Sequence, residues 1–165
     1  MKPAELLDLL RAFYTDKSAM HQRHVAAARL VVDYNFNNTY QYVINREDLQ
    51  LSWLRDVIPE LGGSVPDDPP EPQINVAGKT ADKQAAVVRE DRDAAQAFVD
   101  RWRDKVERIS NARNRNMLRV ILGETLEARR FFDQMLAGRE DLLGRRADGM
   151  GTPGEVIPTR WVGDR

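Results

Sequence analysis

One carboxylate lies where helical periodicity requires an apolar side chain. Glu47 falls inside a stripe that recurs every three or four residues and marks one face of a helix, formed by Tyr40, Ile44, Leu51, Leu54 and Ile58. A buried carboxylate is costly unless it is paired, protonated or bound to a cation, so Glu47 is the first candidate for a functional residue. The alternative places Glu47 and Gln50, one turn on, at the edge of the stripe, where they are solvated or paired with an arginine.

A second helical stretch carries two carboxylates one turn apart. Glu124 stands in an apolar series, and Glu127 follows it on the same side of the helix. Two carboxylates at i and i+3 can both reach one hard or borderline cation, whereas Glu47 has only the neutral Gln50 beside it. We therefore expect Glu124 and Glu127 to form the stronger half of any metal site.

Two histidines and one aspartate complete the set of potential metal ligands. His21 and His24 are three residues apart and can share one ion, although a hydrogen-bonded or exposed pair is the commoner arrangement. Asp91, in the charged run REDRD, lies close to a third apolar stripe, and the alternative is that it is a solvated or arginine-paired acid. Because the chain has no cysteine, a metal has to use Glu, Asp and His as its ligands.

Four long helices are needed to position these residues. The apolar period predicts a short lead-in helix and four long ones, over residues 3–15, 18–33, 39–63, 80–109 and 117–138. Clusters of turn and capping residues place chain reversals at 33–38 and 110–116. Residues 64–79 contain four prolines and no apolar period, so they predict a long crossing loop.

The position of the first reversal decides which residues meet. With the turn at 33–38, antiparallel counting brings His24 level with Glu47 and His21 level with Gln50. A break at Asn45 instead would move Glu47 to one end of the bundle. The apolar stripe keeps its phase through Asn45, which favours the earlier turn.

The overall composition is typical of one soluble domain. The 165 residues are 42% hydrophobic and 31% charged with a net charge of -1, which gives no general attraction to nucleic acid. No apolar run approaches the length of a membrane span, and the first residues lack a secretory pattern, so we expect a cytoplasmic protein. The segment 139–165 has five glycines and two prolines and predicts an extended tail, whose Ile157 and Trp161 could dock on the bundle or on a partner.

The predicted arrangement resembles the ferritin-like superfamily, particularly its rubrerythrin-type helical domain. The resemblance covers residues 18–138 and rests on two antiparallel helix pairs, a long crossover and an acidic i, i+3 motif in the second helix of each pair. The stretches REDLQLSWLRDVIPELGG and ILGETLEARRFFDQML look like the second and fourth helices of that family. The resemblance implies an all-α four-helix bundle in which Glu47 and Glu124 bridge two iron or manganese ions that react with oxygen, peroxide or stored iron.

The chain departs from the family pattern at several ligand positions. Gln50 and Glu127 stand where the resemblance calls for histidines, and the first long helix carries His21 and His24 without a central glutamate. Amide oxygen is a poor ligand for a divalent transition metal, so the first half of the site is weakened. The absence of cysteine also removes the rubredoxin-like electron-transfer module of true rubrerythrins.

Two functions follow from these residues. The first is a noncanonical Fe or Mn oxidoreductase or metal-handling protein with His24, Glu47, Glu124 and Glu127 as ligands, assisted by His21 and Asp91. The second is a ferritin-like bundle that has lost its metal site and serves as a binding or assembly module. In both cases we expect a homodimer or larger homo-oligomer, and neither a nucleic acid nor a membrane as partner. An arginine-based nucleic-acid binder is the weaker third reading, since no basic stripe alternates with aromatic residues.

Overall fold

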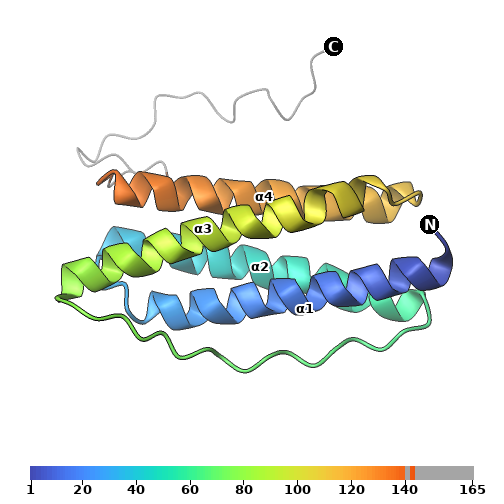
Figure 1. The fold of residues 1–165 in the computed structure, drawn as a ribbon, viewed down its shortest axis with the longest axis horizontal. Helices are drawn as coiled ribbons and strands as arrows, with labels where there is room; N and C mark the ends of the chain where they lie inside the picture. The colour runs from blue at the N-terminus through green and yellow to red at the C-terminus, as the bar shows by residue number, and fades with distance from the viewer. Residues whose placement is uncertain (140–141, 144–165) are drawn as a thin grey trace, which may run out of the picture.

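The computed structural model describes residues 1–139 and 142–143, and within them the chain forms four long helices and no strand (Figure 1). The helices are α1 (Pro3–Ala28), α2 (Tyr34–Glu60), α3 (Thr80–Glu107) and α4 (Ala112–Leu136). The prediction of an all-helical chain with four long helices is thereby confirmed. No helix in the described part of the chain is long and apolar enough to cross a membrane. Most of the expected tail, including Ile157 and Trp161, lies outside the described residues.

The expected lead-in helix over residues 3–15 is wrong, because α1 continues without a break to Ala28. The sequence suggested a cap at Thr15 or Ser18, but both hydroxyls have other partners. The Thr15 hydroxyl donates to the carbonyl of Arg11 within the same helix, and Ser18 donates to Asp68 of the crossing segment. Neither side chain is therefore available to begin a new helix.

Both reversals are shorter than expected. The α1–α2 turn ends at Asp33, whose carboxylate accepts a hydrogen bond from the backbone N–H of Phe36 at 2.9 Å, so α2 begins five residues before the expected Thr39. Asn111 caps α4 in the same way, and that helix begins at Ala112. In each case one capping residue is enough, and the asparagines that follow lie in the first helical turns.

The helices lie as two close pairs, α1 beside α2 and α3 beside α4, and the two helices of each pair run in opposite directions (Figure 1). Side-chain contacts follow the same order. Along α1 from Tyr14 to His24, the partners on α2 fall from Arg55 to Glu47. Residues 61–79 then run along the outside of the bundle from the end of α2 to the start of α3 (Figure 1).

One aspartate of the crossing segment bonds to both helices of the α1–α2 pair. Asp68 accepts hydrogen bonds of 2.6 Å from the hydroxyls of Tyr14 and Ser18, and its other oxygen lies 3.2 Å from Arg55. Gly62, with φ of 80°, ends α2 in the left-handed conformation that glycine adopts without strain. These contacts hold the segment along the bundle although it has no secondary structure of its own.

The apolar core is divided into two clusters by a layer of buried polar side chains. In α2 the first cluster includes Leu51 and the second includes Ile44. Glu47 and Gln50 lie between them and are fully buried. In the other three helices, buried polar residues also lie between the two apolar clusters. The layer therefore crosses the whole bundle. Any chemistry that depends on inward polar groups is therefore concentrated at mid-height.

Candidate functional site

The candidate site is this central layer of buried groups, which we call the polar layer. It receives side chains from all four helices and consists of Lys17, His24, Tyr40, Glu47, Gln50, Asp91 and Thr125. A buried polar group needs a hydrogen-bond partner, so the partners of each member decide what the layer can do.

Glu47 is held by two basic side chains of α1. Its side chain is 3% exposed, Oε1 accepts from Lys17 Nζ at 2.8 Å, and Oε2 lies 2.9 Å from His24 Nδ1. Burial alone would raise the pKa of Glu47, but the charges and hydrogen bonds of His24 and Lys17 lower it to about 2. The carboxylate is therefore ionised. The expected contact of His24 with Glu47 is confirmed.

Lys17 is the central cation of the layer, and the sequence analysis missed it. Its side chain is 1% exposed, and Nζ reaches Thr125 of α4 at 3.3 Å as well as Glu47 of α2. The same ammonium lies 5.5 Å from the ring centre of Phe98 on α3. One charge thus contacts side chains of the other three helices. The available signal was its spacing, since Lys17 precedes the inward-facing Met20 and His24 by three and seven residues.

His24 links the ion pair to the aromatic core. Because an ionised carboxylate can only accept, Nδ1 carries a proton and donates to Glu47. Burial lowers the pKa of His24, but the charge and hydrogen bond of Glu47 together with the charge of Asp91 outweigh burial and leave that pKa raised. Nε2 is buried without a hydrogen-bond partner among the described residues, and the ring lies 5.5 Å from that of Phe132.

Asp91 forms a second closed group at the layer. Its carboxylate is fully buried and accepts from Arg23 Nε at 2.6 Å and from the Tyr40 hydroxyl at 2.5 Å. Burial and the adjacent Asp91 charge raise the pKa of Tyr40 well above its usual value, so the phenol stays protonated and donates. The arginine-paired alternative for Asp91 is confirmed. Asp91 is not joined to Glu47 by any hydrogen bond in the described part of the chain.

Glu124 faces the groove between α2 and α4, where both its oxygens have partners on α2. Arg46 donates to one, and Gln50 Nε2 donates to the other at 2.5 Å. The Glu124 side chain is 16% exposed, so this pair lies at the edge of the core. Gln50 Oε1 is buried without a hydrogen-bond partner in the described structure. Glu124 is therefore a structural partner of an arginine and a glutamine.

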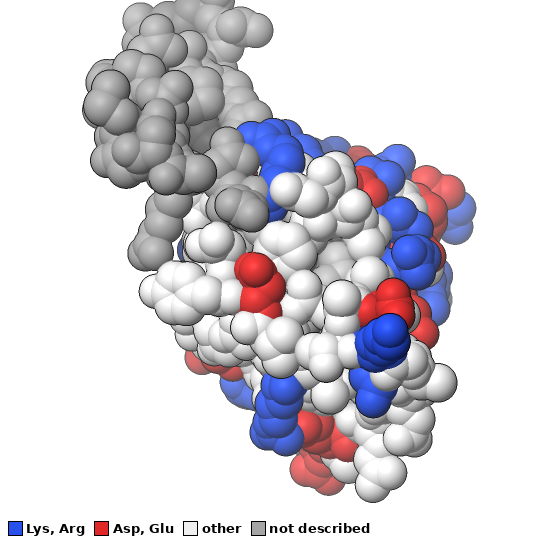
Figure 2. Space-filling view, turned by 90° about the vertical axis from the view of Figure 1, so that its left-hand side faces the viewer, with Lys and Arg blue, Asp and Glu red and all other residues white. Residues whose placement is uncertain are grey.

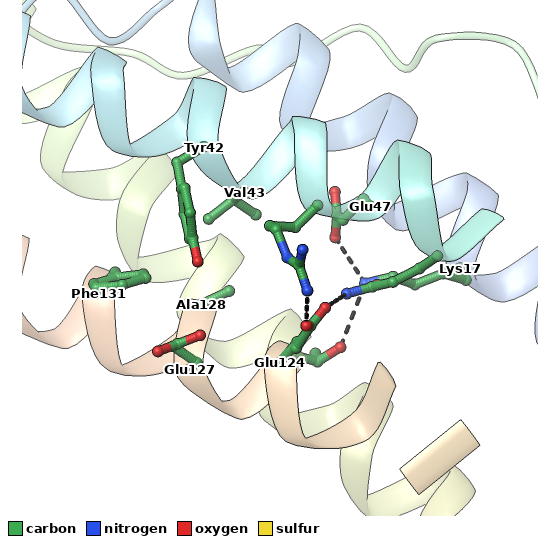
Figure 3. Close-up of a pocket in the computed structure, with 11 residues that line it drawn as sticks. Lys17, Tyr42, Val43, Glu47, Glu124, Glu127, Ala128 and Phe131 are labelled. Carbon is green, nitrogen blue, oxygen red and sulfur yellow. Dashed lines mark hydrogen bonds and ion pairs between the residues drawn. The ribbon is translucent and has the colours of Figure 1, made fainter. Parts of the chain in front are cut away.

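Glu127 points into the same groove without a hydrogen bond or ion pair to any described residue. Figure 3 shows it close to Tyr42 and Phe131, one turn from Glu124. Burial, followed by the charge of Glu127, raises the pKa of Tyr42. The cavity at this point measures about 10 Å³, which is space for roughly one water molecule.

His21 is separate from both groups. Its Nε2 lies 3.0 Å from Asp48, an exposed residue of α2, and not beside Gln50 as antiparallel counting suggested. The six predicted ligands thus divide into four places. Within residues 1–139 and 142–143, no three histidine or acidic side chains are grouped so that they could share a metal ion.

The donor set of the polar layer does not fit a bridged pair of iron or manganese ions. Both oxygens of Glu47 accept hydrogen bonds from cationic or imidazole nitrogen, and both oxygens of Asp91 accept from Arg23 and Tyr40. A divalent ion at Glu47 would have to displace the Lys17 ammonium or lie beside it, and like charges at such distances repel strongly in a buried site. No known protein-family model matches this chain, and neither a curated protein nor a solved structure matches it.

Proposed function

We propose that this chain is a ferritin-like four-helix bundle whose central cation is its own Lys17, and that it serves as a binding or assembly module without redox metal chemistry. The observation that carries the proposal is the Lys17 ammonium, fully buried and bonded to Glu47 and Thr125. It provides positive charge where a ferritin-like site would hold a metal ion.

The helical arrangement supports the ferritin-like part of the proposal. Figure 1 places α1 beside α2 and α3 beside α4, with one long outer connection between the pairs. Each pair carries an inward acid on its second helix, Glu47 on α2 and Glu124 on α4, and α3 adds Asp91. Ferritin-like bundles also hold carboxylates on the inward faces of their helices.

The charges explain how such a bundle is stable without a metal. A lysine supplies one charge and three donors on a flexible stem, so it can satisfy a carboxylate and a hydroxyl at once. Lys17 does this, while Arg23 satisfies Asp91 and Arg46 satisfies Glu124. Glu47, Asp91 and Glu124 therefore each have a cation of the chain as their partner, and none of these three acids requires an added ion.

Metal handling at the α2–α4 groove is the second candidate, and one observation favours it. Glu127 has no partner among the described residues, and Gln50 Oε1 is a buried oxygen without a hydrogen bond. Together with Glu124 these oxygens would suit a hard cation such as Mn(II) better than a redox pair of iron ions. The charge of Arg46 beside Glu124 opposes it.

Metal content separates the two candidates. The full chain is expressed with iron and manganese present, passed over a chelating resin at neutral pH, and analysed for bound metal together with Glu47→Gln and Glu124→Gln. We expect well under one metal per chain in all three proteins. One metal per chain that is lost in Glu124→Gln would establish metal handling in the groove. Metal that is lost in Glu47→Gln would overturn the proposal.

Assembly is tested on the same preparation. Light scattering coupled to gel filtration gives the mass of the particle in solution, and an assembly module is expected to exceed the 18.9 kDa of one chain. If the chain is a monomer at all concentrations, the assembly role is excluded, and only the binding of another molecule remains.

A further inference from the structure

The outer side of α4 carries a shallow depression that is lined by residues of this helix alone. It measures about 710 Å³, and the surface that it exposes is mainly apolar. Val120, which is 44% exposed, and the half-buried Leu126 supply apolar side chains. The aliphatic stems of the arginines at its rim add to them. Contiguous exposed apolar surface of this kind is typical of sites that contact another protein.

The end of the bundle is less suited to such a contact. Figure 2 views the end where α4 finishes and shows charged residues of both signs among the uncharged ones. The depression at this end measures about 270 Å³ and exposes more polar than apolar surface, with Gln84, Arg89 and Arg92 in its lining. The outer side of α4 is therefore the better candidate for a partner surface.

Gly123 lines the depression on α4 and lies in the middle of that helix. Among the described residues it is the one glycine inside a helix, where glycine is less favourable than alanine. A Cβ atom at this position would meet no described atom within 4 Å, so the packing of the chain itself does not require a glycine. What a glycine provides on an exposed helix face is close approach of another backbone.

Two opposite charges flank Gly123 on the same face. Arg119 precedes it by four residues and Glu127 follows it by four, so the three form one row along α4. Glu127 is half-buried and has no ion pair with a described residue. Arg119 bonds to Glu107 through Nε and Nη2, which leaves Nη1 to donate to a further acceptor. The row is thus positive at one end, negative at the other and open between them.

We propose that a second copy of this chain packs on this surface, with the two α4 helices antiparallel about a two-fold axis and crossing at Gly123. Packed helices commonly place their rows of every fourth residue side by side. In this arrangement Arg119 meets Glu127 of the partner subunit, and the two-fold axis forms that pair twice. The inference rests on the proposed assembly role and names its partner and its surface.

The charges of α4 favour this register over others. A symmetric crossing at Gly123 brings Arg130 level with Asn116 of the partner subunit, so no like charges meet there. A crossing at Glu127 would bring two glutamates together, and a parallel pair would place Arg119 beside Arg119 of the partner subunit. Both of these alternatives are opposed by repulsion.

The neighbouring face of α2 extends the apolar surface. A stable interface takes about 800 Å² from each partner, which is more than one helix row supplies. Tyr42 is 39% exposed, and its ring centre lies 5.9 Å from that of Phe131 on α4 (Figure 3). Leu49 is 41% exposed and follows Tyr42 by seven residues on the same face of α2. Both side chains therefore lie on the side of α2 that faces α4.

Exchange of the two charges tests the proposal. Light scattering coupled to gel filtration of the full chain should give twice the 18.9 kDa of one chain. Arg119→Glu and Glu127→Arg each bring like charges together in both contacts, and each should raise the dissociation constant of the dimer about tenfold or more. An equal mixture of the two variants should dimerise again, because each mixed contact joins an acid to an arginine. Arg101→Glu is the matched control, since Arg101 is an exposed arginine that pairs with Asp16 between α3 and α1.

Gly123→Gln tests the close approach without a change of charge. The new side chain has open space in the single chain, so the melting temperature at high dilution should not fall, whereas the dimer should dissociate. The inference is wrong if the dimer persists in all three α4 variants, if the mixture stays monomeric, or if Arg101→Glu weakens the dimer equally. A monomeric wild type would overturn it together with the assembly role. A dimer that the α4 variants leave intact would overturn this surface alone.

Discussion

Glu47 and Glu124 occupy corresponding places, each in the second helix of a pair, but their surroundings differ. Glu47 is enclosed, and its partners Lys17 and His24 both come from α1, the other helix of its own pair. Glu124 is at the edge of the core, and its partners Arg46 and Gln50 both come from α2, across the bundle. The first acid is therefore neutralised within one pair, and the second connects the two pairs.

The difference shows that the acid does not determine its own role. Both glutamates lie beside an apolar stripe in similar sequence motifs, and each would bind a cation in either place. What separates them is where the chain supplies its own positive charge and how completely water is excluded. Exclusion of water raises both the cost of an unpaired charge and the strength of a paired one. Changes around Glu47 should therefore cost much more stability than changes around Glu124.

The largest effect is expected for Lys17→Met. This variant removes the ammonium but keeps a side chain of similar length, so Glu47 is left as a buried carboxylate with only His24 beside it. We expect a loss of about 3–5 kcal/mol in the free energy of unfolding at pH 7, which is the usual cost of breaking a buried ion pair from one side. Urea unfolding measures it.

The double variant Lys17→Met with Glu47→Gln checks the cause. Removing both charges should recover a large part of the loss, since no uncompensated charge remains buried. If the stability losses of the two single variants simply add in the double variant, Lys17 and Glu47 are not energetically coupled. The description of Glu47 as an enclosed, paired acid is then wrong.

A slightly smaller effect is expected from acid. The ordinary pKa of a glutamate is 4.5, and in the folded chain that of Glu47 is about 2. A carboxyl group whose pKa is lowered by folding stabilises the protein at pH values above its unfolded pKa. This stabilisation is lost as the pH falls through the folded pKa. We therefore expect the stability difference between the wild type and Glu47→Gln to shrink by roughly 3 kcal/mol between pH 5 and pH 2, from the shift of about 2.5 units. A constant difference would contradict the closed ion pair.

His24 gives a pH dependence of the opposite sign. Its pKa is raised by Glu47, so its contribution to stability is complete below the ordinary value of 6.5 and is lost as the pH rises through the folded pKa. The stability difference between the wild type and His24→Gln should therefore decrease above pH 6.5. Unfolding curves from pH 6 to pH 9 measure this, and an increase with pH would show that His24 is buried as the neutral form.

Two arginine variants compare the enclosed and edge positions directly. Arg23→Gln leaves the fully buried Asp91 with only the Tyr40 hydroxyl and should cost about 2 kcal/mol. Arg46→Gln weakens a pair that is partly exposed and should cost less than about 1 kcal/mol. Equal losses in the free energy of unfolding, measured in urea, would mean that burial does not distinguish the Asp91 site from the Glu124 site.

Much of the fold was predictable because it depends on periodicity. Apolar residues at helical spacing identified the four long helices, and the prolines of residues 64–79 identified a segment without regular structure. The helix starts were displaced, since one residue, Asp33 or Asn111, provides the whole cap and the polar residues after it enter the helix. The false break near Thr15 has a similar cause, because a hydroxyl can cap a helix or bond elsewhere, and the sequence does not distinguish the two.

The site was predictable only in part. Antiparallel counting from a turn at 33–38 placed His24 beside Glu47, and the two side chains do meet, although the chain reverses earlier, between Ala28 and Tyr34. The burial of Lys17 was not predicted, because lysine is seldom fully buried. Its spacing places it on the inward stripe, but its charge favours an exposed position. The partners of Asp91 and Glu124 depend on how far arginine side chains reach between helices. Periodicity contains no information on that reach.

The smallest effect is expected at the groove, with Glu127→Gln and Glu124→Gln as a matched pair. Glu127 has no ion pair in the described structure, so its loss should change the free energy of unfolding by no more than about 0.5 kcal/mol. Glu124→Gln removes the charge that Arg46 and Gln50 bond to, and should cost slightly more. Thermal melts of both variants and the wild type with and without Mn(II) measure these losses. The order should be the same in both conditions, because a structural partner of arginine acts whether or not metal is added. A wild type that is stabilised by Mn(II) while both variants are not would place a cation between these two carboxylates, and the edge acid would then be the functional one.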